Sequence, residues 1–154
     1  HEVSASLQVV AGHDFVDHDA DPAPPTDAPD SFGAHGISTL STIAGHAGGK
    51  LIGPAFAASY VLARTENDAS ETPLEEDNWI AAIEWADSLG IDIATTSLGY
   101  SAFDDPWGAH TWEDMDGNTT LITRAADMAD CPGSGGRDAP RKLLPFARDP
   151  LKSA

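Results

Sequence analysis

Apolar residues recur along the chain at two different spacings, one typical of strands and one typical of helices. Residues 7–16 and 58–65 are short, mostly apolar runs, which predicts extended segments. Between them, a Pro- and Asp-rich stretch over 17–34 cannot be helical and predicts a long loop. Residues 36–45 place four small or apolar side chains on one helical face and end at a glycine, which predicts a helix with Gly45 at its end; the face is Ile37, Leu40, Ser41 and Ala44.

The clearest helix is predicted over 74–89. Its first turn contains three acidic residues, where the helix dipole favours negative charge, and Gly90 is expected to end it. The face expected to be buried is Trp79, Ile80, Ala82, Ile83, Ala86 and Leu89. A continuous apolar run over 91–99 predicts a strand of the kind buried in parallel sheets. Residues 58–97 are therefore predicted to form a right-handed βαβ unit.

The last described pattern is a second long loop over 100–117, followed by a helix over about 119–130 that Asn118 or Thr119 is expected to cap. A chain of 154 residues is the usual size of one domain. The predicted fold class is α/β, with a partial parallel sheet and packed helices. The sequence predicts two parts, an α/β domain over 1–130 and a Pro-, Gly- and base-rich tail over 131–154.

Acidic residues dominate the charge, with 25 Asp and Glu against 8 Lys and Arg and a formal net charge of −17. Such a surface repels nucleic acid and anionic lipid, so neither is expected as a partner. No apolar run approaches the roughly 20 residues of a membrane span. The charge favours a halophilic type of surface, because counterions at high salt screen the self-repulsion. A protein that is merely acidic is the alternative.

The tail differs from the rest of the chain in charge. Five of the eight basic residues lie in 131–154, together with only two acidic residues. This shift indicates a change of sequence origin, such as a frameshift or a fused vector sequence. The alternative is a natural basic tail that folds back on the acidic body. Cys131 is the single cysteine, so no internal disulfide is possible.

Two short motifs occupy places where α/β sheets bind ligands. His35 and Gly36 stand at the entrance of the first predicted helix, and Ser97, Leu98 and Gly99 end the predicted strand over 91–99. A glycine at a strand end permits backbone pairing with an extended peptide. Taken singly, each motif has an ordinary alternative: a surface or capping histidine for the first, and a plain strand end for the second.

The order of the motifs resembles the subtilisin-like serine peptidases. The His-Gly pair opens a helix of small residues that ends in Ile-Ala-Gly, and a later apolar strand ends in Ser-Leu-Gly; the similarity runs from about Asp14 to Asp130. The resemblance implies part of a three-layer domain, with His35 as the general base of the catalytic triad. It implies that Ser97, Leu98 and Gly99 line the substrate cleft. It also implies a secreted or extracellular protein, although this chain shows no signal peptide.

The chain departs from the family pattern at several catalytic positions. Ile37 stands where the family has Thr after His-Gly, and no Asp-Ser/Thr-Gly segment precedes His35. Segments matching the oxyanion-hole Asn and the nucleophilic Ser are also missing. A triad needs Ser, His and Asp together. We therefore expect an incomplete peptidase fragment that is inactive alone. The alternatives are a non-catalytic, acidic oligomeric or binding protein with a remodelled fold, and a residual hydrolase that uses His35 with improvised partners.

Two acidic clusters suggest metals less strongly than ordinary loop roles. A loop with His and carboxylate side chains could bind Zn²⁺, Cu²⁺ or Ni²⁺, but a solvated acidic loop is the favoured interpretation; it contains His13, Asp14, Asp17, His18, Asp19 and Asp21. Asp114, Asp116 and Asn118 around Gly117 suit Ca²⁺, but helix capping is favoured. No cofactor and no metal site are therefore predicted.

The fragment is also predicted to associate with itself. In the family, the strand with the triad Asp lies between the strands that match 58–64 and 91–97. Without it, both strands would expose unpaired backbone at open edges, which drives association. The remedies are direct pairing of the two strands or exchange of a segment between copies, such as 7–16 or 140–151. A symmetric homodimer is the predicted state.

Overall fold

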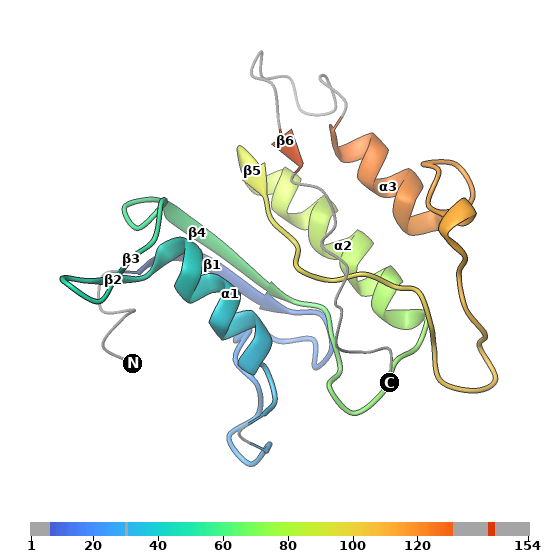
Figure 1. Cartoon of the computed structure of the whole chain (residues 1–154), viewed down its shortest axis with the longest axis horizontal. Coiled ribbons are helices and arrows are strands. Elements are labelled where there is room, and N and C mark those ends of the chain that lie inside the picture. The colour runs from blue at the N-terminus through green and yellow to red at the C-terminus, as the bar shows by residue number, and fades with distance from the viewer. Residues whose placement is uncertain (1–6, 30, 131–141, 144–154) are drawn as a thin grey trace. The chain divides into compact units, whose positions relative to one another are not determined.

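The computed structural model describes residues 7–29, 31–130 and 142–143. The fold is mixed α/β, with three α-helices and short strands among the described residues (Figure 1). By its contacts the chain divides after Arg64 into two compact units, unit 1 (His1–Arg64) and unit 2 (Thr65–Ala154). This division does not test the boundary at residue 130, which stays a prediction.

Unit 1 is built on one parallel strand pair. Strand β1 (Gln8–Asp14) lies beside β4 (Ser59–Arg64), with an irregularity between Val9 and Ala11 that shifts the register. Helix α1 (Ala34–Ala44) and an antiparallel hairpin of β2 (His46–Ala47) and β3 (Leu51–Ile52) complete the unit. The predicted strands over 7–16 and 58–65, and the predicted helix over 36–45, are confirmed.

Gly45 ends α1 as expected, because its N–H donates to the carbonyl of Ser41. The expected apolar face of α1 is only partly buried. Ala44 is buried, whereas Ile37 in the first turn is 60% exposed. Among the described residues of unit 1, Ala44 is the only fully buried apolar side chain. Unit 1 therefore has a small core in this chain.

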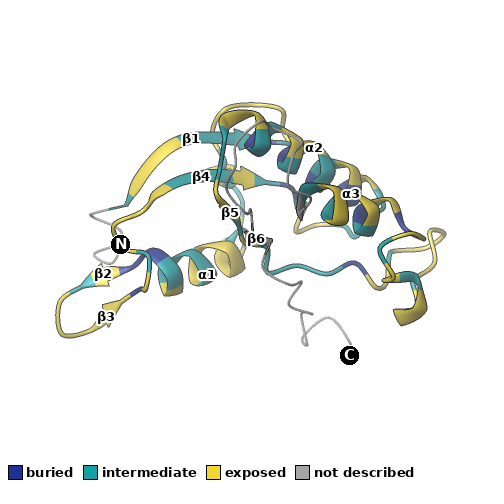
Figure 2. Cartoon of the chain, turned by 90° about the horizontal axis from the view of Figure 1, so that it is seen from above, coloured by how far each residue is buried: buried dark blue, intermediate teal, exposed yellow. Residues whose placement is uncertain are grey.

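Unit 2 is organised around two helices. Helix α2 (Leu74–Leu89) matches the predicted bounds, and α3 (Leu121–Asp130) packs against it. Strand β5 (Ile93–Ala94) pairs in parallel with β6 (Lys142–Leu143), and a 3₁₀ turn η2 (Trp112–Asp114) precedes α3. Figure 2 shows buried positions along both α2 and α3. The core centres on Trp79, Tyr100 and Ile122.

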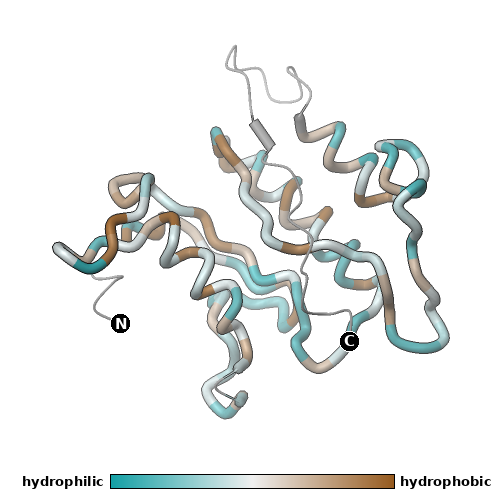
Figure 3. Tube along the Cα trace, in the orientation of Figure 1, coloured by the Kyte–Doolittle hydropathy of each residue, from teal (hydrophilic) through white to brown (hydrophobic). Residues whose placement is uncertain are grey.

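In helix α2, the spacing of apolar residues correctly predicted most of the face that contacts the core. Apolar residues recur along it at helical spacing (Figure 3), and three of the expected six, Trp79, Ala82 and Ala86, are buried. Ile80 and Ile83 pack against the core from partly buried positions. Leu89 is 47% exposed, so its prediction was wrong: it belongs to the last turn, beyond the part of α2 that the core covers.

Three further expectations are corrected by the structure. The run 91–99 is not a continuous strand, because only Ile93 and Ala94 have a pairing partner among the described residues. Strands β4 and β5 belong to separate two-stranded sheets, so the predicted βαβ unit over 58–97 does not form within one sheet. Thr120, rather than Asn118 or Thr119, caps α3: its hydroxyl accepts the N–H of Thr123 at 3.2 Å.

Candidate functional site

His35 is the second residue of α1 and lies at an open helix start. Gly33 precedes the helix with φ of 67°, and it provides no side chain that could cap the first N–H groups. The His35 side chain is exposed, and no hydrogen bond or ion pair to its ring is present among the described residues. At the next residue, Gly36, an added Cβ would meet no atom within 4 Å outside the neighbouring residues and the helix backbone. This setting suits a group that meets a second component from outside.

Ser97, Leu98 and Gly99 follow β5 in unit 2. Residues 95–100 form neither helix, strand nor turn, and Figure 1 shows them as open chain after β5. Within the described ranges, the backbone groups of residues 97–99 have no hydrogen-bond partner. These three residues are half-buried. Half-buried backbone with unused donors and acceptors can pair with an added strand.

Leu98 and Tyr100 hold this segment to the core. Leu98 packs against the cluster of Trp79, Tyr100 and Ile122, and Tyr100 is itself only 3% exposed. Two anchors separated by one residue fix the backbone of Gly99 between them. The Leu98 side chain therefore serves the core, and Leu98 could contribute to a cleft through its backbone only.

His35 belongs to unit 1, and residues 97–99 belong to unit 2. Each half of the predicted site is therefore described by itself. That the two halves form one cleft, as the resemblance implies, stays a prediction.

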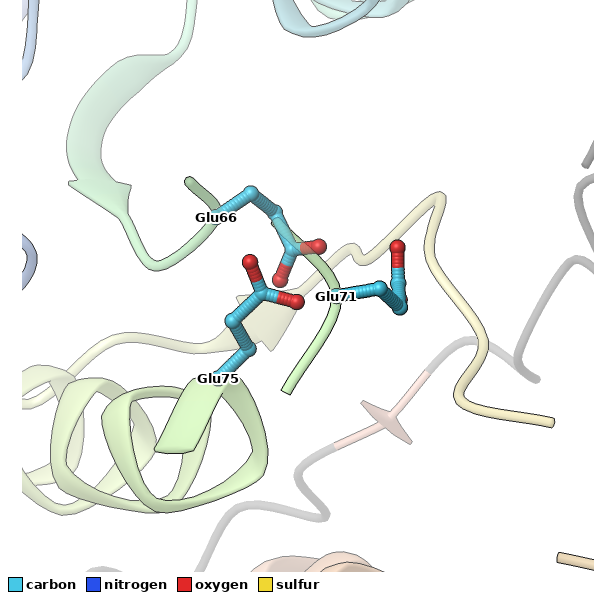
Figure 4. A group of neighbouring side chains, drawn as sticks. All are labelled: Glu66, Glu71 and Glu75. Carbon is cyan, nitrogen blue, oxygen red and sulfur yellow. The ribbon is translucent and has the colours of Figure 1, made fainter. Parts of the chain in front are cut away.

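A cluster of three glutamates lies in unit 2, and no sequence motif predicts it. Figure 4 shows the carboxylates of Glu66 and Glu75 facing one another, with Glu71 beside them. One oxygen of each lies within 4.8 Å of the others. Glu66 and Glu71 come from the loop after β4, and Glu75 comes from the first turn of α2.

Glu75 is the buried member of this cluster and is fixed by a hydrogen bond from the backbone. Glu75 is only 2% exposed, and one of its oxygens accepts the N–H of Asn67 at 2.9 Å. Its position in the first turn of α2 adds the favourable helix dipole. Tyr100 donates its hydroxyl to a Glu66 oxygen. Burial raises the pKa of Tyr100 above its ordinary value, and the nearby Glu66 charge adds to the rise, so the phenol stays protonated as a donor.

Carboxylate oxygens are the ligands that Ca²⁺ prefers, so this cluster is where the described residues could hold a cation. The cluster also has a structural role, because its hydrogen bonds connect the loop after β4 to α2 and to Tyr100. The acidic first turn of α2 was the only sequence signal for it. Glu66 and Tyr100 are 34 residues apart, so their contact could not be read from spacing.

The acidic loop with histidines has a structural explanation. Asp14 is 1% exposed and forms an ion pair with Arg64 at 2.6 Å, and Asp17 forms a second one at 2.7 Å. The N–H groups of Val16 and Asp17 also donate to Asp14. Burial raises the pKa of Asp14, but the hydrogen bonds from Asp17, Arg64 and Val16 together hold that pKa below its usual value. The ionised Asp14, the last residue of β1, thus binds the first residues of the following loop and Arg64 of β4.

The segment around Gly117 also uses its carboxylates for local hydrogen bonds. Asp114 accepts the N–H and hydroxyl of Thr111 and so completes a capping box for η2. Asp116 accepts the N–H groups of Asn118 and Thr119. These bonds lower the pKa of both carboxyl groups. Asp114 and Asp116 therefore stabilise η2 and the turn before α3, and the predicted capping of α3 by Asn118 or Thr119 is wrong.

In the described ranges, no helix is both long enough and apolar enough to cross a membrane. Comparison with known proteins found no match among family models, curated proteins or solved structures.

Proposed function

We propose that this chain is a fragment of a subtilisin-like serine endopeptidase that binds extended peptides along residues 97–99. In this proposal, His35 is the general base that would act in a complete catalytic triad. The fold would then be part of the family's three-layer domain, and the protein would work outside the cell. The order of the His-Gly, Ile-Ala-Gly and Ser-Leu-Gly motifs supports the relationship.

The observation that carries peptide binding is the unused backbone of residues 97–99. Ser97, Leu98 and Gly99 are held by core contacts on either side, and their N–H and C=O groups have no partner within the described part of the chain. An extended peptide laid beside them would satisfy those groups as an added strand does. Because Leu98 and Tyr100 already fix the segment, little conformational entropy would be lost on binding.

Peptide hydrolysis needs a nucleophilic Ser and a carboxylate that orients the His, and no segment of the sequence matches the family's segments that contain them. His35 has an exposed ring without an orienting carboxylate among the described residues, and no segment matches the family's nucleophilic Ser. We therefore expect binding without turnover from this chain alone.

Two measurements test this proposal. We expect no turnover of a chromogenic peptide and no labelling by a fluorophosphonate probe. We also expect an uncharged, acetylated hexapeptide of Ser, Ala and Val to shift the backbone NMR signals of residues 97–99. The same peptide with N-methylated amides is the matched control, because it cannot pair as a strand.

The outcomes separate the alternatives. Equal shifts from both peptides, or none from either, would contradict strand-like binding. Stoichiometric labelling of a serine that His35→Ala abolishes would show a residual hydrolase instead. A Gly99→Pro variant should lose the shifts, while Gly99→Ala, which keeps the N–H, should retain most of them.

A second candidate is a non-catalytic, self-associating protein with a remodelled fold. The observation that favours it is the small core of unit 1, where apolar side chains remain at the surface; they include Val9, Val10, Ile37, Leu51, Ile52 and Phe56. Exposed apolar strands and helix faces favour association. A symmetric homodimer is the simplest closed arrangement.

Light scattering at high salt decides this second candidate. A dimeric mass, reduced to the monomer value by Val10→Lys, would support it. A monodisperse monomer of about the 16.1 kDa chain mass would exclude it.

A further inference from the structure

The loop that follows Gly99 exposes two tryptophans. Trp107 is 60% exposed and Trp112 is 82% exposed, whereas Trp79 in the core is 3% exposed. Trp is among the most energetically important residues at binding surfaces, and an exposed Trp in a fixed loop has no core role to explain it. The loop is therefore a candidate contact surface.

This loop is rigid where it meets the core. Phe103 stacks on Tyr100 with ring centroids 6.4 Å apart, and His110 contacts Phe103 edge-on at 5.2 Å. His110 also lies 3.1 Å from a carboxylate oxygen of Glu76. Backbone bonds from Phe103 to Gly108 and from His110 to Ser101 close the loop upon itself. The exposed tryptophans are thus presented from a preorganised frame.

Along the sequence, the Lys, Arg, Asp and Glu side chains near the two tryptophans have a single sign of charge. Residues 101–120 contain no Lys or Arg, and their acidic side chains are Asp104, Asp105, Glu113, Asp114 and Asp116. Asp104, Asp114 and Asp116 accept hydrogen bonds within the protein. Asp105 and Glu113 are exposed and have no hydrogen-bond or ion-pair partner in the described ranges. Each exposed tryptophan thus has one uncommitted carboxylate close by in sequence.

An aromatic face beside a carboxylate is the chemistry that recognises a guanidinium or ammonium group. The ring attracts the cation through its quadrupole, and the carboxylate forms an ion pair. Arginine suits such a site better than lysine, because its planar group stacks on the ring. The net charge of −17 would also steer a cationic partner toward this chain.

We infer that residues 101–117 recognise basic side chains and so select basic, extended peptides for the strand site at residues 97–99. This inference rests on the proposed function, since it names the substrate class of the same site. Trp107 and Trp112 are five residues apart, so their Cα atoms are separated by at most about 18 Å. Two cations four residues apart in an extended peptide, with Cα atoms about 13 Å apart, fall within this limit.

The test titrates the full chain with three acetylated hexapeptides that differ only at positions 1 and 5. Those positions are arginine, its neutral isostere citrulline, or serine. Calorimetry gives the Kd, and NMR locates binding at residues 97–99. We expect the arginine peptide to bind at least tenfold more tightly than the citrulline peptide at 0.1 M NaCl, and the difference to shrink at 1 M NaCl because salt screens exposed charges.

Variants localise the preference. Trp107→Leu and Trp112→Leu should each weaken binding of the arginine peptide about two- to fivefold, the range of an exposed cation–π contact. Asp105→Asn and Glu113→Gln should each weaken it by up to about fivefold, the range of an exposed ion pair. Glu84→Gln, an equal charge change at an exposed position of α2, is the control and should have little effect.

The outcomes distinguish this inference from the proposed function. Equal affinity for arginine and citrulline peptides, with shifts at residues 97–99, would overturn the inference and keep the strand site. An arginine preference that Glu84→Gln reduces as much as Glu113→Gln does would also overturn it, because only the overall charge would then act. Failure of all three peptides to bind would reject both. If the peptides fail and Trp112→Leu instead reduces self-association, the surface binds a second copy and the inference is wrong.

Discussion

Asp14 is a nearly fully buried charge in unit 1, and Arg64 makes its burial tolerable. Their side chains are 2.6 Å apart, and Asp17 adds a second, half-exposed carboxylate to the same guanidinium. A buried ion pair contributes little net stability, but removing one partner is strongly destabilising because it leaves an uncompensated buried charge. The three residues therefore differ sharply in what their replacement should do.

We predict that Arg64→Met destabilises the fold by about 3–5 kcal/mol, because Asp14 would remain buried and charged. Asp17→Asn should cost less than about 1 kcal/mol, since that pair is solvent-exposed. Urea unfolding followed by far-UV circular dichroism measures both. All four tryptophans lie in unit 2, so circular dichroism, which reports helices and strands in both units, is preferred to tryptophan fluorescence. Equal losses of unfolding free energy for Arg64→Met and Asp17→Asn would contradict the distinction between the buried and the exposed ion pair.

The lowered pKa of Asp14 gives a dependence on pH with a definite sign. A carboxyl group whose folded pKa lies below its unfolded value of about 3.9 stabilises the fold above that pH. This contribution is lost as the pH falls through the folded pKa. Unfolding free energies of the wild type and Asp14→Asn should therefore converge below about pH 4. A difference between them that stays constant from pH 7 to pH 2.5 would refute the role.

Tyr100 should resist ionisation in the folded protein. Burial raises its pKa, and the charge of Glu66 raises it further. The chain has two tyrosines, so in Tyr60→Phe the phenolate absorbance reports Tyr100 alone. We expect that absorbance to appear well above pH 10, the ordinary range, and to return to about pH 10 in urea. A folded midpoint near 10 would mean that the hydroxyl is not held as a donor.

At the scale of elements, glycine stabilises a helix end that needs a positive φ, whereas it destabilises a helix interior. Gly90 ends α2 with φ of 77°, a conformation that a side chain disfavours. Gly36 lies inside α1, where an added Cβ would meet no atom within 4 Å. The same substitution should therefore change stability in opposite directions at the two positions.

We predict that Gly90→Ala destabilises the chain by about 1 kcal/mol, and that Gly36→Ala stabilises it by about 0.5–1 kcal/mol. Thermal unfolding followed by circular dichroism measures both, and Glu84→Gln, at an exposed position of α2, serves as a neutral reference. A loss of stability at Gly36 would mean that α1 is packed more tightly there than its open surroundings indicate.

At the scale of the whole molecule, the excess of acidic residues should make stability depend on salt. A net charge of −17 repels itself at low ionic strength, and added salt screens that repulsion. We predict that Tm rises between 0.05 and 2 M NaCl, with most of the rise below about 0.5 M if screening alone acts. A Tm that stays flat or falls would exclude a halophilic type of surface.

Local chemistry explains why some predictions were confirmed. Helix α2 begins and ends at the predicted residues because its acidic first turn, its apolar spacing and Gly90 are all features of neighbouring residues. The cap of α3 was misplaced by one or two residues because several consecutive polar side chains could serve, and only the fold shows that Thr120 does so. The strand over 91–99 was overestimated because an apolar run does not reveal whether a partner strand is present.

The sequence by itself determined the helices, the two main strands of unit 1, the charge and the order of the short motifs. All of these depend on residues close together in the chain, whose spacing and chemistry can be read directly. Only the tertiary structure decided that Arg64 neutralises Asp14, that Tyr100 meets Glu66, and that the backbone of residues 97–99 lacks a partner among the described residues. The first two features are contacts between residues 50 and 34 positions apart in the chain. The third depends on whether another strand lies beside residues 97–99. The sequence near each residue contains no pattern that indicates either.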